Sequence, residues 1–125
     1  KIDRIIKDFW PGPLTLVLPA RRELPEFLKG PNQTIALRWS SSSVVQEMIK
    51  LGECPLIGTS ANLSGMPSCS SSAEVVEQFG DHTPLLVDSG ILPENPPTTL
   101  LVCTQKPFSF IRSGSIDQKI LEDYI

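Results

Sequence analysis

The chain has 125 residues, 40% of them hydrophobic and 20% charged, which predicts a single globular domain with a modest core. Its net charge of −3 excludes an overall basic field for nucleic acid, although a local basic cleft stays open. No apolar run approaches the ~20 residues of a membrane span. Three widely spaced cysteines, Cys54, Cys69 and Cys103, argue against a disulfide framework or a zinc cluster and fit a reducing, cytoplasmic compartment.

The first third of the chain predicts a helix followed by two strands. Apolar residues at helical spacing run from Ile2 to Phe9, and Pro11 and Pro13 stop this helix. Residues 14–18 and 34–38 read as short strands, joined by a loop with a helical turn near residues 25–29. Because a strand normally precedes such a helix, we expect the chain to be part of a longer domain whose first strands are missing.

The middle of the chain predicts two helices that alternate with two strands. A helix of two to three turns follows the serines at 40–43 and ends before Gly52, and a strand covers residues 55–58. Ser71 and Glu74 have the spacing of a capping box for a helix that stops at Gly80. Residues 84–88 read as another strand.

The last third predicts a strand pair and a helix. A proline-rich loop at 91–97 precedes strands at 98–102 and 108–112. Ser115 and Gln118 have capping-box spacing for the final helix. Strands and helices are mixed without strict alternation, which indicates an α/β domain with a mixed sheet.

Polar residues gather where the apolar strands end. Two arginines are among them, and the small, hydroxyl-rich stretch 58–65 can be either an ordinary loop or a backbone cradle for an anion. One arginine at a strand exit is usually a surface charge, but two of them beside hydroxyl-rich strand ends favour a shared cavity for an anionic ligand. The residues concerned are Thr34, Arg38, Thr59, Ser60, Ala61, Asn62, Thr98, Thr99 and Arg112.

Several common catalytic motifs are absent from the sequence. It contains no G-x-x-x-x-G-K-[ST], G-x-G-x-x-G or H-E-x-x-H, and no G-x-S-x-G supports a serine nucleophile. His82 is the one histidine and reads as a solvated loop residue, so we expect no protein-bound metal. The chemistry left to such a site is substrate positioning and charge stabilisation without a covalent nucleophile.

Six short motifs follow one another along nearly the whole chain. They are PGPLTLV (11–17), IALR (35–38), TSANLSG (59–65), VDSG (87–90), PTTLL (97–101) and IRSG (111–114). Each motif is weak alone, but their order and spacing are specific. This order resembles that of the YrdC-like family of threonylcarbamoyl-AMP synthases.

This resemblance implies both a fold and a reaction. The fold is an open, twisted mixed sheet with helices on one side and a large, positively charged concave cavity. L-threonine, bicarbonate and ATP with Mg²⁺ would give L-threonylcarbamoyladenylate and diphosphate, and a partner complex would then modify adenosine 37 of tRNA. By the same resemblance Arg38, Thr59 and Thr98 hold L-threonine, and Thr34, Ala61, Ser68, Cys69 and Arg112 contact ATP. Ser60 and Asn62 line the same pocket, and no residue is assigned a covalent catalytic role.

The sequence also departs from the family pattern. Thr98 replaces a serine, Val102 an aspartate, and Ser40 and Ser113 each replace a proline. The Lys-x-Arg motif of the family's N-terminal part is absent from residues 1–125, so we expect the C-terminal two-thirds of a YrdC-like domain, without full activity alone. Two alternatives stay open: a YrdC-like module for nucleotide or RNA binding or carbamoyl transfer without synthesis, and a relative whose site has decayed.

Overall fold

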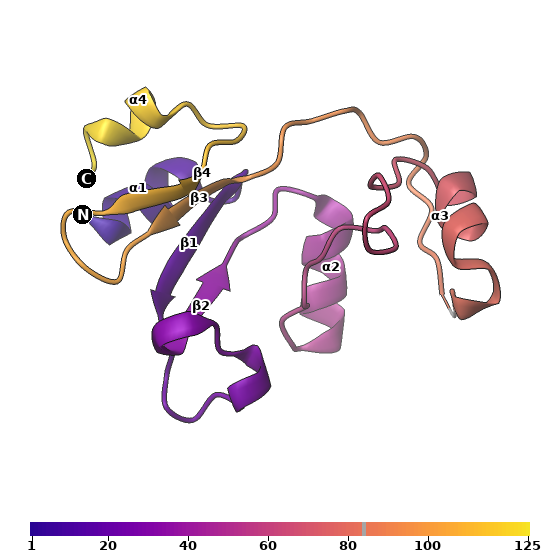
Figure 1. Cartoon of the computed structure of the whole chain (residues 1–125), viewed down its shortest axis with the longest axis horizontal. Helices are drawn as coiled ribbons and strands as arrows, with labels where there is room; N and C mark the ends of the chain where they lie inside the picture. The colour runs from indigo at the N-terminus through magenta and orange to yellow at the C-terminus, as the bar shows by residue number, and fades with distance from the viewer. Residues whose placement is uncertain (84) are drawn as a thin grey trace. The chain divides into compact units, whose positions relative to one another are not determined.

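The computed structural model describes residues 1–83 and 85–125. These residues form two compact units, each of which is described by itself (Figure 1). The first, which we call the sheet unit, comprises Lys1–Cys54 and Pro96–Ile125. The second, which we call the loop unit, comprises Pro55–Asn95.

The sheet unit is built on a four-stranded mixed sheet in the order β2-β1-β3-β4 (Figure 1). Its strands are β1 (Leu14–Pro19), β2 (Thr34–Leu37), β3 (Thr99–Val102) and β4 (Ser109–Arg112). β1 pairs in parallel with β3, and the two outer pairs are antiparallel. The predicted mixed sheet and its four strands in this unit are confirmed.

The core lies on one face of this sheet, beneath the helices α1 (Ile2–Phe9) and α4 (Gln118–Glu122). Leu14, Leu16 and Leu101 contribute from the strands, Ile5 comes from α1 and Leu121 from α4, and all five are fully buried. Side chains alternate along a strand, so Thr15 and Val17 point to the opposite face. The predicted arrangement of helices on one side of the sheet is therefore confirmed for α1 and α4.

The register brings four strand ends to one edge of the sheet. Leu14 pairs with Thr99, Leu16 with Leu37, and Leu100 with Arg112. The start of β1, the end of β2, the start of β3 and the end of β4 therefore lie together, and we call this the site edge.

The other elements of the sheet unit follow β1 and β2. The 3₁₀ turns η1 (Glu26–Leu28) and η2 (Pro31–Gln33) lie in the β1–β2 connection. η1 confirms the helical turn predicted near residues 25–29. α2 (Ser43–Gly52) is capped by Ser42, whose hydroxyl accepts a hydrogen bond from the Val45 N–H. The helix includes Gly52 rather than ending before it, because Glu53 takes the left-handed conformation at its C-terminus.

The cap of the last helix also differs from the predicted one. Asp117, not Ser115, caps α4 by accepting a hydrogen bond from the Lys119 N–H. The Ser115 hydroxyl instead donates to the carbonyl of Pro96, 2.8 Å away, and Gln118 donates to the hydroxyl of Ser113. A capping box needs both side chains for the helix terminus, and here both are used by neighbouring loops.

The loop unit contains α3 (Ser72–Phe79) and the 3₁₀ turn η3 (Gly80–His82). The helix has the predicted cap, since Ser71 accepts from the Glu74 N–H, while the Glu74 carboxylate reaches back to the N–H of Ser70. The helix ends at Gly80, as predicted, and the φ angle of Gly80 is positive.

The two strands predicted in the loop unit are not present in the described residues. Residues 55–58 are irregular, with Leu56 and Ile57 exposed, and residues 85–88 form no strand. Residue 84, the first of the second predicted strand, lies outside the described residues. A short apolar run becomes a strand only when another strand accepts its backbone hydrogen bonds, and the described part of this unit provides none.

Two further sequence expectations concern cysteines and membrane spans. Cys54, Cys69 and Cys103 are free thiols, and burial raises the pKa of the Cys103 thiol to about 11. Within residues 1–83 and 85–125, no helix is long and apolar enough to cross a membrane.

Candidate functional site

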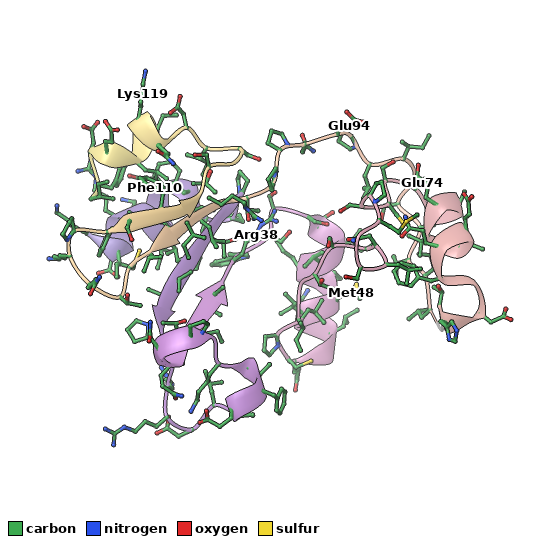
Figure 2. The ribbon with its side chains drawn as sticks, viewed as in Figure 1. Arg38, Met48, Glu74, Glu94, Phe110 and Lys119 are labelled. Atoms are coloured by element: carbon green, nitrogen blue, oxygen red, sulfur yellow. The ribbon has the colours of Figure 1, made fainter. Side chains whose placement is uncertain are left out.

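Arg38 lies at the site edge, where the chain leaves β2 (Figure 2). Its Nε donates a hydrogen bond to the carbonyl of Gly12 at 3.0 Å, and the N–H of Gly12 donates to the carbonyl of Trp39 at 2.8 Å. A Cβ at position 12 would overlap the carbonyl oxygen of Phe9, so this turn needs glycine. The turn at Gly12, before β1, therefore holds the Nε of Arg38 in place.

Thr98 and Arg112 form a second cluster at the same edge. Arg112 donates from Nε and Nη2 to the Thr98 carbonyl, at 3.1 and 3.0 Å, and from Nη2 to the Thr98 hydroxyl, at 3.1 Å. The hydroxyl of Thr15 in β1 lies 3.0 Å from the same Thr98 hydroxyl. The structure thus joins two residues predicted to bind different substrates and adds Thr15, which was not predicted.

A close backbone contact holds this cluster in place. A Cβ on Gly114 would overlap the Pro97 carbonyl oxygen and the Thr98–Thr99 peptide, so glycine is required where the chain leaves β4. The next N–H, that of Ser115, donates to the Pro97 carbonyl at 2.9 Å. This contact gives a physical reason for the glycine two residues after Arg112.

The site edge carries the guanidinium groups of Arg38 and Arg112. No ion pair among the described residues involves Arg38 or Arg112. Both η nitrogens of Arg38 and the Nη1 of Arg112 have no hydrogen-bond partner within the described part of the chain. The two η nitrogens of Arg38 can bind a carboxylate or a phosphate through paired hydrogen bonds, and Nη1 of Arg112 can donate to one as well.

Thr34 is separated from these residues along the sheet. It begins β2 and pairs with Pro19, whereas Arg38 follows the other end of the strand. Four residues of strand place the two roughly 13 Å apart. The Thr34 hydroxyl donates to the Pro31 carbonyl at 2.8 Å, which closes the local turn. Its contact with ATP stays a prediction.

The remaining predicted residues lie in the loop unit. The N–H of Cys69 donates to the carbonyl of Ala61 at 2.8 Å, which draws the two ends of the stretch 61–69 together. Asn62 donates to the carbonyls of Leu63 and Met66 from inside this stretch, and the Ser68 hydroxyl lies 3.5 Å from its amide oxygen. Asn62 thus shapes the loop with its side chain. Thr59 and Ser60, just before it, are exposed.

Gln78 of α3 forms two hydrogen bonds to the same loop, a role that the sequence did not predict. Its amide oxygen accepts from the Leu63 N–H, and its amide nitrogen donates to the Pro67 carbonyl, both at 3.0 Å. The sequence indicates only that Gln78 lies on a helix after a capping box. It does not identify the loop as the hydrogen-bond partner of the Gln78 side chain.

A cavity of about 140 Å³ lies within the loop unit. Its walls come from the loop 61–71, from α3 and from the segment 86–92, which contains the VDSG motif. The lining residues are Ala61, Cys69, Ser70, Ser71, Ser72, Val75, Leu86, Val87, Asp88, Ser89, Gly90 and Leu92. Two of the residues predicted to contact ATP, Ala61 and Cys69, therefore share one cavity.

Asp88 is the acidic residue in this lining. Its carboxylate accepts from the Gly90 N–H at 2.8 Å and from the Ser72 hydroxyl at 2.9 Å. These bonds, first that of Gly90 and then that of Ser72, lower the pKa of Asp88 below its usual value. Asp88 thus stays ionised and joins the VDSG motif to the start of α3.

The described residues include no group of three or more His, Cys, Asp or Glu side chains that could hold a metal ion. What the described residues do offer is guanidinium N–H groups, hydroxyls and backbone amides. Such donors bind anions and position them without a covalent step.

Comparison with known proteins agrees with this description. The Sua5/YciO/YrdC family model, described as telomere recombination, matches residues 1–114. The threonylcarbamoyl-AMP synthase of Pyrococcus abyssi is 33% identical over 123 residues, which cover 98% of this chain and 36% of that protein. The Klebsiella pneumoniae enzyme of the same name is 46% identical over 77 residues, 62% of this chain and 40% of the relative.

Solved structures show the same fold. P. abyssi Sua5 complexed with L-threonine matches with a TM-score of 0.90 and 33% identity, over 99% of this chain and 36% of that one. Escherichia coli YciO matches with a TM-score of 0.82 and 27% identity, over 93% of this chain and 57% of that one. The chain thus spans well under half the length of the two synthases. Its matched residues, its sheet and its motif order place it in the Sua5/YciO/YrdC family.

Proposed function

We propose that the protein carrying this chain is an L-threonylcarbamoyladenylate synthase. It would form threonylcarbamoyl-AMP and diphosphate from L-threonine, bicarbonate and ATP. The product would serve a tRNA-modifying complex that transfers the threonylcarbamoyl group to adenosine 37, and the compartment would be the cytoplasm.

One observation carries this proposal: the chain superimposes along 99% of its length on a family member crystallised with L-threonine. The site edge supports it independently, because Arg38, Arg112 and the Thr98 hydroxyl lie along that edge and the two arginines keep N–H groups for an anionic ligand. An amino-acid carboxylate and a triphosphate are both ligands of this kind.

We assign the residues as follows. Arg38 would bind the carboxylate of L-threonine, with Thr59 and Thr98 contacting the same substrate. The free Nη1 of Arg112 would bind ATP. Magnesium would arrive on the ATP phosphates, so the protein itself would need to supply no metal ligand. Further ATP contacts would come from Thr34, Ser60, Ala61, Asn62, Ser68 and Cys69.

The chemistry needs only positioning and charge stabilisation. Bicarbonate would condense with the threonine amine to give the carbamate and water. A carbamate oxygen would then attack the α-phosphorus of ATP, and diphosphate would leave. Holding the reactants together lowers the entropic part of the barrier, and cationic N–H groups stabilise the charge that develops on the phosphate oxygens.

The test is diphosphate release by the full-length gene product, with each substrate omitted in turn. We expect release only when L-threonine, bicarbonate and ATP are all present, together with a product of the mass of threonylcarbamoyl-AMP. Diphosphate release that does not depend on threonine would overturn the proposal. Strongly salt-dependent RNA binding without turnover would support a binding module instead.

The role of Arg38 is tested with Arg38→Ala. Loss of a charge-assisted hydrogen bond is expected to weaken L-threonine binding about tenfold to hundredfold, measured by calorimetry. Arg21→Ala is the matched control, since Arg21 lies exposed in the β1–β2 connection. Equal threonine affinity in Arg38→Ala and its parent would remove Arg38 from the site.

A further inference from the structure

Thr15 carries the one hydroxyl group of β1. At the site edge its Oγ1 lies 3.0 Å from the Oγ1 of Thr98. We propose that Thr15 is a positioning residue: its hydroxyl holds that of Thr98 so that Thr98 donates a hydrogen bond to an oxygen of the amino-acid substrate. This inference rests on the proposed function, because it takes Thr98 to contact L-threonine.

The backbone of Thr98 is fixed on both sides. Before it, the Pro97 carbonyl accepts from the Ser115 N–H, and after it, the Thr99 N–H donates to Pro13 at 3.1 Å. The buried Thr99 hydroxyl exchanges hydrogen bonds with the backbone of Ile116. With the main chain held in this way, the freedom left to Thr98 is rotation of its side chain and of its hydroxyl proton.

Two neighbours restrict that remaining freedom. Arg112 Nη2 donates to the hydroxyl oxygen of Thr98 at 3.1 Å and occupies one of the two lone pairs of that oxygen. Thr15 either donates to the second lone pair or accepts the Thr98 proton. In the first case Thr98 keeps its proton for a ligand, and in the second it offers a ligand only a lone pair.

Charge selects between the two arrangements. The cationic guanidinium of Arg112 lies against the Thr98 side chain, so a ligand ammonium group is repelled there and a ligand oxygen is attracted. A Thr98 hydroxyl that donates suits a ligand oxygen. Thr15 is therefore the donor of the Thr15–Thr98 pair, and Thr98 donates onward to the substrate.

The test measures L-threonine and ATP affinity by calorimetry on the full-length protein. Thr15→Val keeps the shape and removes the hydroxyl, and we expect L-threonine to bind about three- to tenfold more weakly, as for one lost hydrogen bond. Thr15→Ser keeps the hydroxyl and is expected to stay within about twofold of the parent. ATP affinity should not change in either variant.

Coupling to Thr98 separates positioning from packing. In a Thr98→Val background, adding Thr15→Val is expected to cause no further loss of threonine affinity. Thr104→Val, in the exposed connection between β3 and β4, is the matched control and should bind like the parent. If Thr15→Val does not fold, Thr15→Ala removes the same hydroxyl at this half-buried position.

The outcomes that contradict the inference are distinct. Parental threonine affinity in Thr15→Val, or an equal loss for threonine and ATP that Thr15→Ser does not rescue, would overturn it while leaving the proposed function intact. Additive losses in the double variant would also overturn it, because Thr15 would then act independently of Thr98. A parent protein that binds no L-threonine would overturn the proposed function and this inference together.

Discussion

The sheet unit and the loop unit hold their candidate residues by different means. Every hydrophobic residue that is buried in the described chain belongs to the sheet unit, on or beside its four strands and its helices α1 and α4. In the loop unit, apolar residues such as Ile57, Leu85 and Ile91 are largely exposed. Its shape rests instead on side chains that bond to the backbone, above all Asn62, Gln78 and Asp88.

Substitutions should therefore act differently in the two units. In the sheet unit the core fixes the strand register, and the register sets the site edge. In the loop unit, single polar side chains fix single turns, so a substitution there should change local geometry more than global stability.

Leu101→Ala should have the largest effect. Leu101 is fully buried on β3, and its truncation leaves a cavity that costs about 2–5 kcal/mol in the free energy of unfolding. Leu85→Ala in the loop unit is the control, because Leu85 is 78% exposed and should change stability by less than ~0.5 kcal/mol. Urea denaturation of both variants measures the difference, and equal midpoints would contradict the contrast between the units.

Gly114→Ala should come next. An added methyl would overlap the backbone of Pro97 and Thr98, so we expect a loss of about 1–3 kcal/mol together with weaker threonine binding, because Thr98 shifts. At Gly58 in the loop unit a Cβ meets nothing within 4 Å, so Gly58→Ala should be tolerated. Thermal denaturation and threonine titration would test the pair. Unchanged stability and binding in Gly114→Ala would show that the contact is not needed.

Gln78→Ala should act locally. It removes both hydrogen bonds to the loop 61–69, each worth about 0.5–1.5 kcal/mol, and should speed hydrogen exchange at the Leu63 amide. Exchange in the sheet unit should not change. Glu77→Ala, at the exposed neighbouring position, is the control. Faster exchange throughout the chain would instead indicate that the loop unit contributes to global stability.

The smallest effect concerns pH. The Gly90 N–H and the Ser72 hydroxyl lower the pKa of Asp88 below its usual 3.8, because both bonds favour the ionised carboxylate. Asp88 therefore stabilises the loop unit above pH 3.8, and this contribution is lost as the pH falls through the lower pKa of the folded state. The Gly90 amide shift should follow this titration by NMR and lose it in Asp88→Asn. A midpoint at or above 3.8 would contradict the bond to Gly90.

The sheet unit was largely predictable from its sequence. The apolar spacing of Ile2, Ile5, Ile6 and Phe9 indicated α1, and the prolines at 11 and 13 marked its end. Short β-branched and leucine runs indicated all four strands. These patterns succeed because the residues bury one face of a helix or alternate along a strand, and both periods are visible in sequence.

The loop unit was predicted less well. Its capping box and Gly80 correctly marked α3, because a cap depends on residues within one turn. The apolar runs near 55 and 85 suggested strands and were wrong for the described residues, because pairing depends on a partner strand. In the sheet unit, the Ser115 cap was wrong for a related reason, since the Ser115 hydroxyl donates to the Pro96 carbonyl.

The helices, the strands of the mixed sheet and the motif order that indicates the family are all visible in the amino-acid sequence. These features depend on short-range periodicity, turn residues and spacing. The folded chain adds three contacts or separations that no sequence pattern indicates. The Arg112 guanidinium donates to Thr98, the Thr15 hydroxyl bonds to the Thr98 hydroxyl across 83 residues of sequence, and Thr34 lies away from both. Hydrogen bonds over such separations depend on sheet order and register, which no local pattern specifies.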